Sequence, residues 1–144
     1  MIKPITTPET YPIRSVVLRP NRPLSECYFA GDNDASTHHF GYFENDNLVG
    51  IVSVFKASFQ GITAQNPFQI RGMAVLETHQ HKKIGKKLMI YVEDFCQTQH
   101  TDFIWFNART SAENFYKKLG YQTFGNYFMI PDVCEHIVMM KNFK

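Results

Sequence analysis

Hydrophobic and polar positions alternate along the chain with two different periods, which separate predicted strands from predicted helices. Apolar runs or two-residue alternation predict strands, whereas apolar residues three or four positions apart predict helices. Helices are predicted over residues 7–18, where Thr7-Pro8-Glu9 is a typical start, and over residues 84–100. Strands are predicted at residues 2–5, 39–44, 48–59, 68–76, 103–107, 122–129 and 135–141.

A third, short helix is predicted after the strand at 103–107. Thr110-x-x-Glu113 matches a capping box, and Gly120 is placed to end the helix in a left-handed conformation. The buried stripe of this helix is expected at three positions with helical spacing, namely Ala112, Phe115 and Leu119. Residues 19–37 are rich in Pro, Asn, Asp and Gly and predict a long loop.

The strand at 68–76 changes the parity of its apolar positions at Gly72. These positions are even before the glycine and odd after it: Phe68, Ile70, Met73 and Val75. One extra residue in a strand produces this change, so we expect a β-bulge, a feature that is common beside active sites. A chance irregularity in a short strand would give the same pattern.

Composition indicates a folded domain. The chain has 144 residues, of which 44% are hydrophobic and 15% aromatic, which excludes a disordered tail or linker. Alternating strands and helices indicate an α/β fold, expected as one domain over residues 1–144. A formal net charge of +2 argues against nucleic-acid binding. No apolar run is long enough to span a membrane, and the N-terminus lacks a signal-peptide pattern, so a cytoplasmic protein without a membrane partner is expected.

The three cysteines, Cys27, Cys96 and Cys134, are odd in number and widely spaced, which favours reduced thiols over a disulfide framework. Cys134-x-His136 is too small a group to form a zinc site alone, and no metal is expected.

The segment from Gln80 to Leu88 joins a predicted strand to a predicted helix and carries four lysines within six residues: Lys82, Lys83, Lys86 and Lys87. Free N–H groups and the macrodipole make a helix N-terminus favourable for an anion, and Gly85 would let a phosphate approach the backbone. A solvated basic face is the alternative interpretation.

These motifs resemble those of the GCN5-related N-acetyltransferases. Residues 80–85 resemble the family's acyl-CoA loop, Gln/Arg-x-x-Gly-x-Gly/Ala, and residues 112–121 resemble its next helix motif. The match is strongest over residues 68–121. Lys83 replaces the first glycine of the loop motif, and Arg109 stands where many relatives have an asparagine, a role that Asn107 would take over.

The resemblance implies a central mixed, mostly antiparallel sheet of six or seven strands, flanked by three or four helices. It also implies that the bulged strand is splayed from its neighbour and that acetyl-CoA, the cosubstrate, lies in the opening. The implied cofactor-binding residues are Met73, Ala74, Val75, Gln80, His81, Lys82, Lys83, Ile84, Gly85, Lys86, Asn107, Ala112, Phe115 and Tyr116.

The activity implied is transfer of an acetyl group to a primary amine by direct attack in a ternary complex. The Val75 N–H is expected to stabilise charge on the thioester oxygen, and Tyr116 to act as general acid, although Tyr116 could instead be a core residue. Glu77 is the first candidate for the general base. The alternatives are His136, His38, His39 and an ordered water. A non-catalytic acyl-CoA-binding module remains the alternative function.

The acceptor pocket is expected to form from residues 19–37, the hairpin at 45–47 and the last two strands. Three carboxylates could attract a cationic amine: Asp32, Asp34 and Glu44. Arg71, in contrast, could face the acceptor, a small molecule or peptide, and select an anionic group on it such as a carboxylate, or form an ordinary surface ion pair. Tyr127 and Phe128 would suit the edge of a homodimer.

Overall fold

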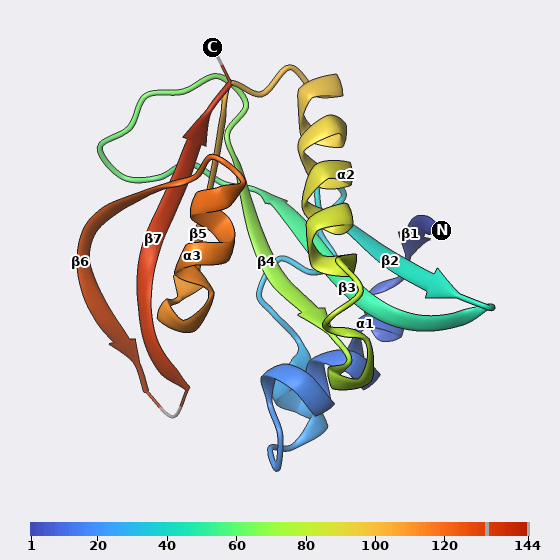
Figure 1. The fold of residues 1–144 in the computed structure, drawn as a ribbon. Coiled ribbons are helices and arrows are strands. Elements are labelled where there is room, and N and C mark those ends of the chain that lie inside the picture. Colours follow the sequence, from blue (N-terminus) through green and yellow to red (C-terminus); the bar gives the residue numbers. More distant parts are fainter. Residues whose placement is uncertain (132, 144) are drawn as a thin grey trace.

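The computed structural model describes residues 1–131 and 133–143 and contains a seven-stranded mixed sheet (Figure 1). The strand order is β1-β2-β3-β4-β5-β7-β6, and every neighbouring pair is antiparallel except β4 and β5. The strands are β1 (Ile2–Ile5), β2 (His38–Glu44), β3 (Asn47–Lys56), β4 (Phe68–Val75), β5 (Phe103–Arg109), β6 (Gln122–Ile130) and β7 (Cys134–Asn142). The expected mixed, mostly antiparallel sheet is confirmed.

Within residues 1–131 and 133–143, three α-helices and four short helical turns connect the strands. The helices are α1 (Thr7–Ile13), α2 (Ile84–Thr98) and α3 (Glu113–Lys118). A π-helical turn, η1 (Arg14–Leu18), continues α1. The 3-10 turns are η2 (Leu24–Cys27), η3 (Glu77–His79) and η4 (Thr110–Ala112). The segment predicted as one helix over residues 7–18 is therefore α-helical only in its first half.

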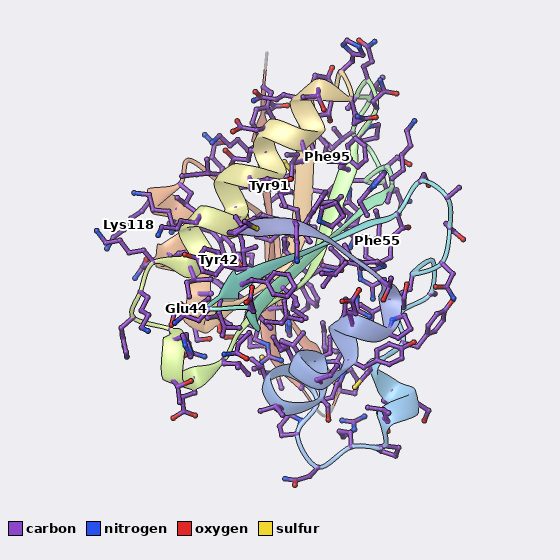
Figure 2. All side chains as sticks on the ribbon, turned by 90° about the vertical axis from the view of Figure 1, so that its right-hand side faces the viewer. Tyr42, Glu44, Phe55, Tyr91, Phe95 and Lys118 are labelled. Carbon is purple, nitrogen blue, oxygen red and sulfur yellow. The ribbon has the colours of Figure 1, made fainter. Side chains whose placement is uncertain are left out.

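Alternation along β3 places α1 and α2 on opposite faces of the sheet, as Figure 2 shows from the side. Ile51 packs with Ile13 of α1, whereas Val52 belongs to the core cluster that contains Leu88 of α2. The ring of Tyr116 in α3 belongs to that same cluster. The sheet thus has an α1 face and an α2 face, and α3 covers part of the α2 face.

The bulge predicted at Gly72 is present. The register between β3 and β4 runs from Ile51↔Ala74 to Ser53↔Arg71, so that two residues of β4 lie opposite one residue of β3. Gly72 has φ +66°, and a Cβ there would lie 3.1 Å from the Phe29 ring. Glycine is therefore favoured both by the left-handed backbone and by the close approach of an aromatic ring.

Strands β4 and β5 are paired at only two positions, Phe68↔Ile104 and Gln69↔Trp105. Beyond Gln69 the two strands separate, and the edge of β4 loses its neighbour on that side. This is the splayed arrangement that the sequence resemblance implies.

The short helix α3 differs from its prediction. The predicted capping box is wrong, because Thr110 lies in the 3-10 turn η4 and the helix begins after Ala112 without a side-chain cap. A 3-10 turn has fewer residues per turn than an α-helix, so it rotates the face that follows. Tyr116 is therefore buried, whereas Phe115, predicted to lie in the buried stripe, is 38% exposed.

A buried polar network holds residues 14–32 against the α1 face. Arg14, which is fully buried, donates to the Asp32 carboxylate at 2.6 and 3.1 Å and to the Ser53 hydroxyl at 3.1 Å. The Asp32 carboxylate also accepts from the Phe29 N–H at 2.7 Å. His39 completes the network through Ser53 at 2.6 Å. The ion pair and the hydrogen bonds of Arg14 and Asp32 offset the cost of removing these two charges from water.

We expect Asp32→Asn to lower the free energy of unfolding by about 3–5 kcal/mol, because it leaves the Arg14 guanidinium buried without a counter-charge. Urea unfolding followed by circular dichroism measures this change. The matched control is Asp34→Asn, since Asp34 is exposed, and it should change stability by less than about 0.5 kcal/mol. Equal effects of the two substitutions would contradict a structural role for the ion pair.

Candidate active site

A cleft of about 530 Å³ lies where β4 and β5 separate. Its walls come from β4 and β5, from η1 and the Phe29 segment on the α1 face, and from the start of α2 together with α3 on the α2 face. Residues from both faces of the sheet therefore line the cleft, and we call its part on the α1 face one mouth and its part on the α2 face the other. None of the described residues that line it is an aspartate or a glutamate.

The mouth on the α2 face is lined by the N-terminus of α2. The first backbone hydrogen bond of the helix joins the Lys87 N–H to the Lys83 carbonyl at 3.1 Å. Among the described residues, the N–H groups of Ile84, Gly85 and Lys86 have no acceptor. Free N–H groups, the helix dipole and the adjacent lysines together make this mouth favourable for a phosphate.

Lys83 is the N-cap of α2 and has φ +62° and ψ +22°, in the left-handed region. Lys83 stands at the position of the first glycine in the acyl-CoA loop motif that this segment resembles. The backbone here is of the kind that favours glycine, and a side chain at this position is strained. The departure from glycine therefore has a conformational cost.

The backbone of Val75 faces the cleft. The Leu76 N–H donates to the Val49 carbonyl at 2.9 Å, and Val75 lies opposite Gly50 in the next pair. Antiparallel ladders alternate between bonded and non-bonded pairs, so the polar groups of Val75 are directed away from β3, toward the open edge of β4. The Val75 carbonyl accepts from the Gln80 side chain at 3.0 Å, which is consistent with this direction.

Tyr116 lines the cleft from α3. Tyr116 is 8% exposed, and its ring packs on Phe106 with a centroid distance of 4.5 Å. Its hydroxyl makes no hydrogen bond to the described residues. Burial raises the pKa of Tyr116 to about 12, while the charge of Arg109 opposes this change. Tyr116 therefore stays protonated at neutral pH and can donate a hydrogen bond into the cleft.

His136 of β7 lines the cleft beside Arg109, with which it is paired across the strands. Its Nδ1 lies 2.7 Å from the Cys134 carbonyl oxygen, which can only accept, so in the neutral ring Nδ1 carries the proton and Nε2 has the free lone pair. Burial lowers the pKa of His136, the hydrogen bond to Cys134 raises it, and the charges of Arg109 and Arg19 lower it. His136 is therefore an unprotonated base near neutral pH.

Comparison with known proteins identifies the family. Residues 5–121 match the family model described as "Acetyltransferase (GNAT) family". The chain belongs to this acetyltransferase family. It is 32% identical, over 99% of its length and 96% of the relative's, to the uncharacterized N-acetyltransferase YitI of Bacillus subtilis (strain 168).

Two solved structures show the same fold as this GNAT protein. Escherichia coli ElaA has a TM-score of 0.79 and 20% identity, with 99% of each chain covered. An aminoglycoside 6'-N-acetyltransferase complexed with coenzyme A has a TM-score of 0.73 and 14% identity, with 100% of this chain and 97% of that chain covered.

The GNAT fold brings most of the predicted cofactor-binding residues to the cleft. Those that line it are Met73, Ala74, Val75, Gln80, Lys83, Gly85, Lys86, Asn107, Ala112, Phe115 and Tyr116. Three side chains lie elsewhere. His81 is exposed, Lys82 forms an ion pair with Glu44 at 3.1 Å, and Ile84 is 1% exposed in the core. The backbone N–H of Ile84 at the start of α2 has no acceptor among the described residues.

The structure does not bring Glu77 into the cleft. Glu77 lies in the turn η3 and is exposed, outside the residues that line the cavity. Two further candidates for the base also lie outside it. His38 packs on Phe95 at 4.7 Å, and His39 belongs to the buried network with Ser53. Of the candidate side chains for the base, His136 alone lines the cleft.

The prediction that carboxylates attract a cationic acceptor is wrong for Asp32 and Glu44. Asp32 is buried against Arg14, and Glu44 is paired with Lys82 and with His79 at 3.2 Å. Figure 2 shows Glu44 at the end of the β2–β3 hairpin, whose residues 45–47 do not line the cleft, contrary to expectation. Asp34 is exposed and also lies outside the cleft.

Several lining residues were not singled out from the sequence: Val17, Leu18, Arg19, Phe29, Gln69, Ile70, Phe106, Ala108, Ser111, Ile130 and Val133. Arg19 and Phe29 belong to the loop that was expected to build the acceptor pocket, but no local pattern distinguishes them from their neighbours. Their position depends on the Arg14–Asp32 network, which joins residues far apart in the sequence.

Within the described ranges, no group of three His, Cys, Asp or Glu side chains is placed to hold a metal ion. None of the described helices has the length and apolar character needed to cross a membrane.

We expect Lys83→Gly to raise the free energy of unfolding by about 0.5–1 kcal/mol, since it relieves a left-handed backbone and loses little else. Denaturant unfolding without ligand measures the change. Lys86→Gly is the matched control in the first turn of α2, where the backbone is right-handed, and it should destabilise the protein. A loss of stability in both variants would show that Lys83 is not strained.

Proposed function

We propose that residues 1–144 act as one N-acetyltransferase domain that transfers the acetyl group of acetyl-CoA to a primary amine by direct attack in a ternary complex. One observation carries this proposal. The cleft has free N–H groups and lysines at one mouth, an unprotonated histidine at the other, and a protonated tyrosine in its wall. These are the groups that acyl transfer from a thioester to an amine requires.

Acetyl-CoA would supply the acetyl group as a thioester. The N–H groups of Ile84, Gly85 and Lys86 would bind its pyrophosphate, with the Lys83 and Lys86 side chains neutralising charge. The open edge of β4 from Met73 to Val75 would bind the pantetheine arm through main-chain groups. The absence of carboxylates from the described lining residues supports this fit, since a carboxylate would repel the phosphates.

Val75 and Tyr116 would stabilise the charge that develops as the bond to sulfur breaks. The Val75 N–H would donate to the carbonyl oxygen of the thioester. Tyr116 would donate a hydrogen bond to the departing sulfur. Because the pKa of Tyr116, about 12, lies above that of a thiol, about 8.5, Tyr116 would stabilise the thiolate while keeping its own proton, and solvent would complete the protonation.

His136 would take the role of general base, for which Glu77 was the first candidate. Its Nε2 would accept a proton from the amine as the new C–N bond forms and the nitrogen becomes acidic. His136 lies opposite Arg109 on the neighbouring strand, and Arg109 donates to the Leu18 carbonyl on the α1 face. Because His136 therefore lies on the α1 face, the acceptor would enter the cleft from that face. The acetyl donor would enter from the α2 face, in agreement with a ternary complex.

The function is tested by titrating the protein with acetyl-CoA in a calorimeter, with ATP as the comparison, and then measuring thiol release with a pooled panel of amines. We expect micromolar binding of acetyl-CoA and release of thiol with at least one pool. Tyr116→Phe should lower kcat by about 10- to 1000-fold and leave acetyl-CoA affinity nearly unchanged, since only stabilisation of the leaving thiolate is lost.

Tyr121→Phe is the control for Tyr116→Phe. Tyr121 packs on the same Phe106 ring, but its hydroxyl bonds Glu93 at 2.7 Å, so turnover should be unaffected. Binding of acetyl-CoA without thiol release from any pool would favour a non-catalytic acyl-CoA-binding module. Failure to bind acetyl-CoA would overturn both functions.

His136 predicts the acid limb of the pH profile. Its pKa is lowered, so the neutral base persists below the usual value of about 6.5, and kcat/KM should fall only as pH drops below that value. Below pH 6.5 the unfolded protein binds a proton at His136 more readily than the folded protein does. The contribution of His136 to the free energy of unfolding is therefore present above pH 6.5 and is lost as pH falls through the lowered pKa. His136→Asn should lower kcat and remove the limb.

The control is His100→Asn, because His100 is exposed and lies outside the cleft. It should retain both the rate and the acid limb. An unchanged pH profile in His136→Asn would exclude His136 as the base.

A further inference from the structure

Three of the five arginines have no acidic partner among the described residues. Arg14 is paired with Asp32, and Arg22 is paired with Glu26. The other three all line the cleft, and none forms an ion pair within the described ranges: Arg19, Arg71 and Arg109. A guanidinium that is partly buried without a counter-charge is costly, and its position in a cleft indicates a ligand that supplies the charge.

The three guanidinium groups converge on one mouth of the cleft. The Cζ atoms of Arg71 and Arg19 lie 4.8 and 5.6 Å from the centroid of the Phe29 ring. Arg19 and Arg109 both donate to the Leu18 carbonyl, at 3.0 and 3.5 Å. The three arginines come from the residue after η1, from β4 and from β5, which are distant in the sequence.

This mouth is the one on the α1 face, away from the lysines of α2. Arg71 lies opposite Ser53 on the neighbouring strand, and the Ser53 hydroxyl accepts a hydrogen bond from Arg14 on the α1 face. Arg109 lies opposite His136 on the neighbouring strand. Cross-strand partners share a face of the sheet. The arginine cluster therefore surrounds the proposed base, on the side from which the acceptor would enter, and is separate from the proposed phosphate site.

The arginines of this cluster lower one another's pKa values. Burial lowers the pKa of Arg71, Asp32 raises it, and the charges of Arg14 and Arg19 lower it. Burial likewise lowers the pKa of Arg19, as do Arg109 and Arg22. A guanidinium keeps its charge in a protein, so each of the three groups would gain from an anion held between them.

Building on the proposed function, we infer that the acceptor is a small amine that also carries a carboxylate, held by Arg71 with Arg19 and Arg109 so that its nitrogen lies near His136. A guanidinium binds a carboxylate through two parallel hydrogen bonds, which fixes orientation as well as charge. Arg71 stacks near both Phe29 and Phe55, at 4.8 and 5.2 Å, and these rings would hold its plane. A polycationic amine would be repelled by the same cluster.

The test uses pairs of acceptors that differ only in the carboxylate: L-phenylalanine with phenethylamine, L-tyrosine with tyramine, and L-lysine with cadaverine. At saturating acetyl-CoA, kcat/KM should be about 10- to 100-fold higher for the carboxylated member of a reactive pair, as expected for charge-assisted hydrogen bonds. The amino-acid amides, which keep the amine and lose the charge, should behave like the decarboxylated amines. Dipeptides distinguish a free amino acid from a peptide whose terminal carboxylate is bound.

Arg71→Gln should remove most of this preference and raise KM for the carboxylated acceptor more than it lowers kcat. Arg71→Lys should recover part of it, because it restores the charge without the paired hydrogen bonds. The matched control is Lys118→Gln, which removes a positive charge from an exposed position outside the cleft, labelled in Figure 2. It should leave the preference unchanged.

A binding measurement separates this inference from the proposed function. The same acceptor pairs are titrated by calorimetry into the protein saturated with coenzyme A, where no acetyl transfer occurs. Binding of the carboxylated members, weakened in Arg71→Gln, would support the anion site even if no amine released thiol. Equal turnover within each pair would overturn the inference and leave acetyl transfer intact. Absence of binding and of preference in every pair would also overturn it.

Discussion

Pairing between β4 and β5 ends after two residue positions, and the geometry of the active site depends on this separation. An unpaired strand edge normally attracts other chains, because its N–H and C=O groups have no partners. Here the open edge of β4 lies inside the cleft, where the bulge at Gly72 changes the direction of its groups and Val75 presents its backbone to the cavity. The groups left without strand partners are the ones available to a substrate.

The Arg14–Asp32 ion pair gives the cleft its second wall. It joins the end of α1 to the loop before β2 and bonds both to Ser53 in the sheet, so that residues 14–32, which contain only the short turns η1 and η2, are held firmly. This wall carries Arg19 and Phe29. Arg14 is thus neutralised inside the protein, while the arginines that line the cleft on the same face form no ion pair with the described residues. Lysines line the cleft on the α2 face and arginines line it on the α1 face, so both mouths carry positively charged side chains.

Much of the fold could be predicted because its signals are local. The parity change at Gly72 marks the bulge, the lysine-rich turn before α2 marks the free helix N-terminus, and the order of strands and helices agrees with the structure. The family, too, follows from short motifs. Element ends were less certain. Thr6, one residue before the predicted start, caps α1 through its N–H bond to Glu9 at 2.7 Å, and η4 rotates the face of α3.

The sequence by itself determined the sheet, its bulge and the loop at the start of α2, because residues close in the chain dictate backbone hydrogen bonding and periodicity. Only the tertiary structure decided which charged groups are available for chemistry. Asp32 is neutralised by Arg14, 18 residues away, and Glu44 is paired with Lys82, 38 residues away. His136 gains its free Nε2 and its lowered pKa from its place between strands. A charge is available only where no distant partner neutralises it, and folding sets those distances.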